Sequence, residues 1–140
     1  MRVVRAAFVY FACVFAAGFV LGTIRVPLLV PALGVRTAEL LELPVMVAIA
    51  GWIARVRCRR EHDLTAGQHL AFGGLAMAML LVAECGLGAL LGKSPAQVLF
   101  DRDPIAGPAY YVALLVTACW PWWWATRRRR GGASLAKQSD

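Results

Sequence analysis

Four long apolar runs, separated by short polar breaks, dominate the hydrophobic pattern of the chain. They cover about residues 6–23, 38–54, 68–91 and 108–125, and each has about the 17–25 residues that an α-helix needs to cross a bilayer. The pattern predicts an all-α polytopic membrane protein with four transmembrane helices. These helices form one domain over residues 1–130 and leave a mobile cytoplasmic tail at 131–140.

The first apolar run follows a short basic leader and has the features of a signal peptide. No convincing small-x-small cleavage site precedes the next polar break, however, and three further apolar runs follow. We therefore expect a retained helix rather than a cleaved leader.

The break between the first two runs contains Pro27, Pro31 and Gly34. Proline removes a backbone donor and clashes with the preceding helical turn, while glycine favours a change of direction. This spacing excludes one uninterrupted helix and predicts a tight, apolar hairpin.

Two capping boxes mark the starts of later helices. Thr65 and Gln68 predict that the third helix begins at about Ala66. Ser94 and Gln97 repeat the pattern after the third run, and predict a short surface helix between the third and fourth spans.

The composition agrees with a membrane protein. Hydrophobic residues make up 60% of the chain and charged residues 16%, and the mean hydropathy is +0.63. A soluble domain of this length does not carry such an apolar excess.

The distribution of cations predicts the topology. Eleven of the fifteen lysines and arginines fall in segments that lie on one side if the N-terminus is cytoplasmic, so both termini are expected in the cytoplasm. The net charge of +7 then indicates attraction to anionic lipid headgroups rather than to nucleic acid, because no stacking aromatics alternate with the arginines on a soluble face. The expected lipid contacts are Arg55, Arg57, Arg59, Arg60, Arg127, Arg128, Arg129 and Arg130.

Four charged residues of the outward half form the candidate site: Arg25, Glu39, Glu42 and Glu84. Glu39 and Glu42 share a helix face because they lie three residues apart. Glu39 alone is also explained as a first-turn acid after an N-cap at Thr37. A charge at the centre of a bilayer costs about 2.5–3.5 kcal/mol on insertion scales, so we expect these side chains to meet inside the bundle.

Two functions remain open for this cluster. In the first, it fixes helix packing in a structural or accessory membrane subunit, which would assemble with itself or with another membrane protein. In the second, it is a ligand or proton site of a small transporter-like protein, with Glu84 or Glu42 as the titrating group. The structural function is the leading hypothesis at this point.

The sequence gives little support for an enzyme. The four cysteines form no CxxC pair, and no phosphate loop, nucleophile elbow or HExxH motif is present. Cys58, His62 and His69 match no closed zinc pattern, so we expect no metal, cofactor or catalytic residue.

The residues Gly22-Thr23-Ile24-Arg25 and the segment from Glu39 to Met46 resemble a pattern in small, uncharacterised four-helix inner-membrane proteins of bacteria. The resemblance covers mainly the first two spans. It implies four spans and a bacterial inner membrane, and it implies no activity.

The chain is also similar in size and span number to the small multidrug exporters, which use a membrane glutamate for proton coupling. The essential carboxylate of that family lies in the first span, whereas residues 6–23 contain no acid. Proton-coupled export is therefore the alternative rather than the leading interpretation.

Overall fold

The computed structural model describes residues 1–61, 63–101 and 103–136, with side chains through Arg128. The predicted all-α class is confirmed: the structure is 90% helical, and the described residues form no strand. The elements are α1 (Arg2–Ile24), a π-helical segment η1 (Arg25–Leu29), α2 (Val30–Arg60), α3 (Ala66–Leu90), α4 (Pro95–Phe100) and α5 (Ala106–Ala136).

The chain reverses direction at Gly34, inside the segment that carries the α2 label. Gly34 has φ 77° and ψ 162°, a backbone conformation that favours glycine because it has no Cβ. Pro27 lies within η1 instead of ending the first helix, and the N–H of Val30 bonds the carbonyl of Arg25 across a wider π-helical turn. The first helical segment therefore continues well past the predicted end of the first span near residue 23.

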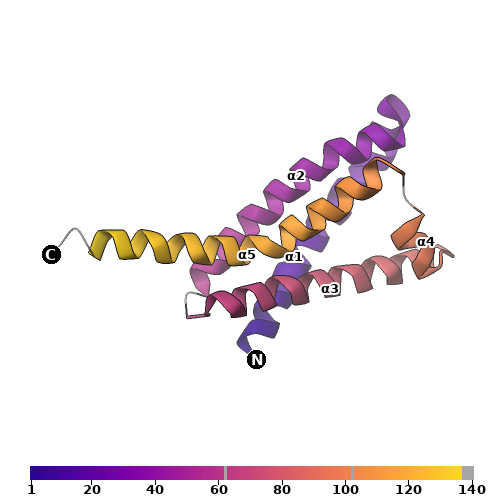
Figure 1. Cartoon of the computed structure of the whole chain (residues 1–140). Helices are drawn as coiled ribbons and strands as arrows, with labels where there is room; N and C mark the ends of the chain where they lie inside the picture. Colours follow the sequence, from indigo (N-terminus) through magenta and orange to yellow (C-terminus); the bar gives the residue numbers. More distant parts are fainter. Residues whose placement is uncertain (62, 102, 137–140) are drawn as a thin grey trace.

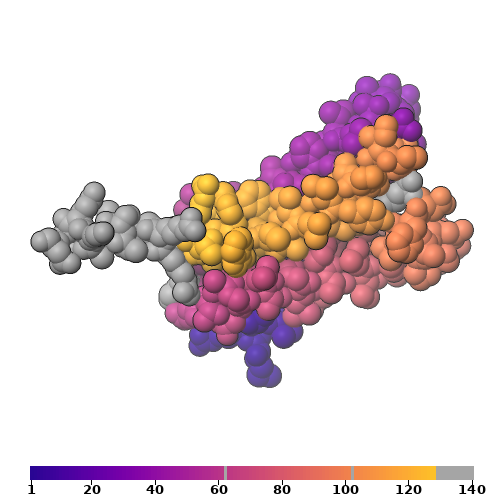
Figure 2. Space-filling model, in the orientation of Figure 1, coloured from indigo at the N-terminus to yellow at the C-terminus, as the bar shows by residue number. Residues whose placement is uncertain are grey.

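The long helices form a four-membered bundle (Figure 1). Helix α1 packs against α2 and α3, and α5 packs against the same two helices from the other side. Figure 2 shows α5 lying between the surfaces of α2 and α3. The short α4 folds back against α3, and the Ser94 capping box predicted for it is present.

The main hydrophobic core of the bundle lies near the end that holds the N-terminus and the α2–α3 loop. The core there combines the rings of Tyr10 and Phe72, which meet edge to face at 5.3 Å, with small side chains. These small residues let the helices approach closely. They are Ala6, Ala7, Ala50, Ala54 and Ala76.

Tryptophans of α5 bind α2 at this end with a repeated four-residue spacing. The Nε1 of Trp120 donates to the carbonyl of Val47, and the Nε1 of Trp124 donates to the carbonyl of Gly51, both at 3.1 Å. Helix α5 continues through Pro121 and reaches Ala136, beyond the predicted end of the fourth span near residue 125.

Two helical stretches are long and apolar enough to cross a membrane. One is the stretch Arg2–Arg60, which contains the reversal at Gly34, and the other is Ala66–Leu90.

A close contact between α3 and α5 supplies a stability test. A Cβ on Gly73 of α3 would lie 2.0 Å from the carbonyl oxygen of Ala118 in α5, whereas a Cβ on Gly74 meets nothing within 4 Å. We expect Gly73→Ala to lower the free energy of unfolding by about 1–3 kcal/mol, because the backbones must separate. Thermal unfolding in a mild detergent measures the effect.

Gly74→Ala is the matched control, since it adds the same methyl group one residue away. We expect it to be neutral or stabilising by up to about 1 kcal/mol, from the higher helix propensity of alanine. Equal melting temperatures for the two variants would contradict the close contact between α3 and α5.

Candidate functional site

A cavity of about 700 Å³ lies between the helices toward the Gly34 end of the bundle. Side chains of α1, η1, α2, α3 and α5 line it, and most of them are apolar. Val14, Val47, Leu80 and Thr117 lie at its deep end, next to the packed core. The volume falls within the range of about 300–1,000 Å³ that is usual for small-molecule sites.

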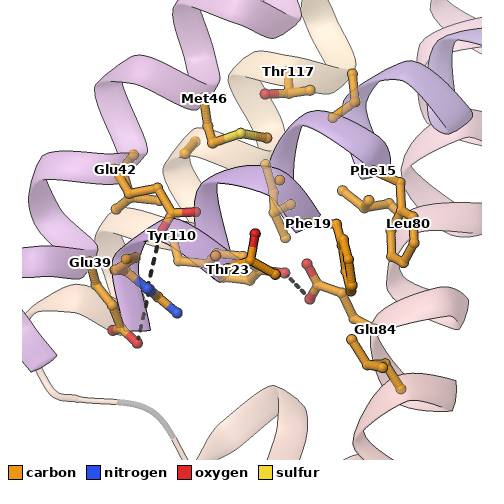
Figure 3. A pocket seen from close by; sticks show the side chains of 18 of the residues that line it. Phe15, Phe19, Thr23, Glu39, Glu42, Met46, Leu80, Glu84, Tyr110 and Thr117 are labelled. Carbon is orange, nitrogen blue, oxygen red and sulfur yellow. Dashed lines mark hydrogen bonds and ion pairs between the residues drawn. The ribbon is translucent and has the colours of Figure 1, made fainter. Parts of the chain in front are cut away.

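All four charged residues predicted for the site line this cavity, on two sides of it. Figure 3 shows Glu39 and Glu42 on α2 and Glu84 across from them on α3. The contacts described for these side chains fall into two groups.

The first group is an ion-pair triad of Arg25, Glu39 and Glu42. The Nη1 of Arg25 lies 3.5 Å from Glu39 Oε1, and its Nε lies 3.1 Å from Glu42 Oε2. The hairpin explains this pairing: Arg25 precedes the Gly34 reversal by about as many residues as Glu42 follows it, so the two side chains come to the same level. The three side chains are 15–27% exposed and line the cavity, while the two facing atoms Arg25 Nε and Glu42 Oε2 are themselves buried.

The second group joins Glu84 to Tyr110 of α5. The hydroxyl of Tyr110 donates a hydrogen bond to Glu84 Oε2, and both side chains line the cavity. Tyr110 was not predicted as a site residue, because at the edge of an apolar run it has the pattern of an interfacial aromatic. Its hydroxyl, which needs a partner when buried, was the signal that could have placed it here.

A further ion pair joins α2 to the segment before α5 at the Gly34 end of the bundle. Arg36 donates from Nε and Nη2 to Asp103 Oδ2, both at 2.7 Å. The other oxygen of Asp103 accepts the N–H groups of Ile105 at 2.9 Å and Ala106 at 3.1 Å, at the start of α5. These two backbone hydrogen bonds, together with the bond from Arg36, lower the pKa of the Asp103 carboxyl below its usual range.

The predicted lipid-binding arginines gather at the opposite end of the bundle. Arg55 lies over the ring of Trp124 at 5.0 Å, and Arg127 lies over the ring of Trp123 at 3.9 Å. Arg128 donates to the carbonyl of Cys58 at 2.9 Å.

The remaining predicted lipid contacts differ in accessibility. Arg57 pairs with Glu61 at 2.9 Å and is largely buried, which makes it the least available of the group. Arg59 and Arg60 are exposed. The side chains of Arg129 and Arg130 lie outside the described part of the structure.

The described residues contain no group of three His, Cys, Asp or Glu side chains that could hold a metal ion. Cys58 donates from Sγ to the carbonyl of Pro121 at 3.3 Å. The Nδ1 of His69 lies 3.0 Å from the carbonyl of Thr65 in the helix cap. His62 lies outside the described residues.

Comparison with known proteins identifies no relative: no family model, curated protein or solved structure matches the chain. Any functional assignment must therefore come from the cavity and its side chains.

The pKa of Asp103 predicts how stability depends on pH. A carboxyl whose pKa is lowered by folding stabilises the protein above its unfolded value of 3.8, and this contribution is lost as the pH falls through the folded value. We expect the melting temperature of the wild type to exceed that of Asp103→Asn at pH 7, and the difference to shrink below about pH 4.

Thermal unfolding in detergent between pH 7 and pH 2.5 checks this expectation. Asp101→Asn is the control, because Asp101 is an exposed carboxylate in the same connection. A wild-type advantage that stayed constant down to the lowest pH would contradict the role of the Asp103 charge.

Proposed function

We propose that the chain is a four-span protein of the bacterial inner membrane that binds a small amphipathic molecule in the outward half of its bundle. In this proposal both termini lie in the cytoplasm. The observation that carries the proposal is the cavity of about 700 Å³, in which a few charged and hydroxyl groups are set in a mainly apolar wall.

The reversal at Gly34 supports four spans, because it divides the apolar stretch Arg2–Arg60 into two antiparallel helices. Helix α3 is the third span, and the apolar part of α5 is the fourth. Arg5 and Arg25 lie about 30 Å apart along the first helical segment, which matches the thickness of the hydrocarbon core. Arg25 then lies at the outer boundary of that core and Arg5 at the inner one.

The ends of the bundle support the orientation. Arg55 and Arg127 stack on tryptophans at one end, as expected for an interface rich in cations and aromatic rings. The positive-inside rule places this end in the cytoplasm. The cavity and the Arg36–Asp103 pair then face outward.

A structural or accessory role is the second candidate, and the Arg25 triad favours it. Its ion pairs join η1 to α2, and such contacts fix how two helices pack. Packing alone does not explain the cavity, however, since a purely structural interior is normally filled by side chains. For this reason we rank ligand binding above the structural role.

The topology gives the first test of this proposal. In a variant whose four native cysteines are replaced by alanine, we expect a membrane-impermeant maleimide to label Lys93→Cys in intact spheroplasts. Arg60→Cys should react only after permeabilisation, because it lies on the cytoplasmic side. Labelling of Arg60→Cys alone before permeabilisation would reverse the orientation, and equal labelling of both would contradict a spanning arrangement.

Ligand binding is tested by filling the cavity. Gly22 lines it, and a Cβ at this position meets nothing within 4 Å. We expect native mass spectrometry of the wild type, released from mild detergent, to show a bound small molecule or lipid that Gly22→Phe loses because the ring occupies its space.

Gly86→Phe is the matched control. Gly86 also has open space around its Cβ position, but it does not line the cavity. This variant should keep the bound molecule. Loss from both variants, or from neither, would contradict binding in the cavity.

Glu84→Gln separates the two candidate functions. Loss of the bound molecule with an unchanged melting temperature supports a ligand site. A lower melting temperature or a dissociated assembly, with the bound molecule unchanged or never observed, supports the structural role.

A further inference from the structure

We infer that the cavity opens sideways toward the lipid between α1 and α3, and that it takes up the acyl chain of a membrane lipid whose headgroup carries an amine. This inference rests on the proposed function and specifies the ligand class and its route of entry.

The rim of the cavity shows where it opens. The lining side chains on the α1–η1 side include Phe19 and Val26, which are 56% and 60% exposed. On α3 they include Leu87 and Leu91, which are 41% and 71% exposed. These exposed lining residues are apolar, as a border with acyl chains requires.

The opposite wall is less accessible. The lining residues Leu43 and Met46 of α2, and Ala113 and Leu114 of α5, are only partly exposed. Helices α2 and α5 remain in contact through Trp120 and Trp124. A molecule that reaches this wall has therefore entered through the bundle and does not merely coat its surface.

The cavity is closed toward the cytoplasmic end. Its deep residues Val14 and Thr117 adjoin Tyr10, which is 2% exposed and donates to the carbonyl of Thr117 at 3.0 Å. The structure therefore provides a one-ended site rather than a path across the bundle.

The polarity of the cavity follows that of an outer-leaflet lipid. Its deep end is apolar apart from Thr117, whereas Arg25, Glu39 and Glu42 lie toward the outward end. Val14 and Arg25 lie about 16 Å apart along the helix axis, a length that an extended acyl chain can occupy. A lipid entering with its chain inward would bring its headgroup to the triad.

The charge of the triad selects the headgroup. Two carboxyl groups share one guanidinium at 3.5 Å and 3.1 Å, so the ionised triad has one negative charge in excess. A lipid amine complements that excess, while Arg25 can contact the phosphate of the same headgroup. A lipid with an anionic headgroup and no amine gains only the second interaction.

Photo-crosslinking in nanodiscs tests both parts of the inference. Two probes with identical acyl chains carry a diazirine near the chain end, one a phosphatidylethanolamine and the other a phosphatidylglycerol. Mass spectrometry then locates the modified residues. We expect label at Met46 or Leu114, and about threefold to fivefold more of it from the ethanolamine probe, as for one partly exposed charge pair.

Variants of the triad and of the cavity show which residues cause the headgroup preference and the labelling. Glu39→Gln and Glu42→Gln each remove the excess charge, so the ratio between the two probes should approach one in either variant. Gly22→Phe should abolish labelling of Met46 and Leu114 on the far wall, formed by α2 and α5, by both probes. Gly86→Phe should preserve this labelling. Val82 is 71% exposed on the surface of the bundle. Label on this residue reports that the probe surrounds the protein in every sample.

Equal or stronger far-wall labelling by the glycerol probe would overturn the amine assignment. Label confined to exposed surface residues such as Val82 would overturn lateral lipid entry. Neither result decides the proposed function, which is tested separately by the expected loss of a bound molecule from Gly22→Phe and its retention by Gly86→Phe.

Discussion

A backbone carbonyl left without its usual donor joins three helices of this bundle. Pro121 has no N–H for the carbonyl of Thr117, one turn earlier in α5. The hydroxyl of Tyr10 in α1 donates to this carbonyl at 3.0 Å and approaches that of Ala50 in α2 at 3.3 Å. A carbonyl without a hydrogen bond raises the free energy of the folded state in an apolar environment. The hydrogen bond that is missing within α5 is therefore replaced by one from α1, and Tyr10 links α1, α2 and α5.

The two ends of the bundle differ because their side chains differ in size and charge. Near the N-terminal end, alanines and Gly73 allow the helices to touch, and the indoles of Trp120 and Trp124 fix α5 to α2. Toward Gly34, the carboxyl groups and Arg25 require room for solvation or for partners. The helices are joined there by Arg36–Asp103, Glu84–Tyr110 and the Arg25 triad, and the space between these contacts is the cavity.

Local sequence features predicted the parts of the fold that depend on local physics. Both capping boxes are present with both of their hydrogen bonds, because Thr65 and Ser94 act on residues only three positions away. The break between the first two apolar runs was also predicted, although the positive φ of Gly34 locates it more sharply than the prolines did. The π-helical turn at Pro27 was missed, since a proline normally indicates an end rather than a widened turn.

The site was predictable only in its charged members. Carboxyl groups within an apolar run are identifiable as candidate site residues from the sequence alone. Tyr110 lies in the candidate site only because α5 packs beside α3. The cavity itself depends on how far four helices separate, which no single helix encodes. The Arg36–Asp103 contact likewise joins residues that are distant in sequence and follows from the bundle as a whole.

In the proposed membrane arrangement, the position of the triad has a consequence for biosynthesis. Arg25, Glu39 and Glu42 belong to one helical hairpin, so their charges can compensate each other as soon as the first two helices enter the bilayer. The hydrogen bond between Glu84 and Tyr110 forms only after α5 has been made. The hairpin can therefore be inserted as a unit with its charges already paired, whereas the α3–α5 side of the cavity is completed last.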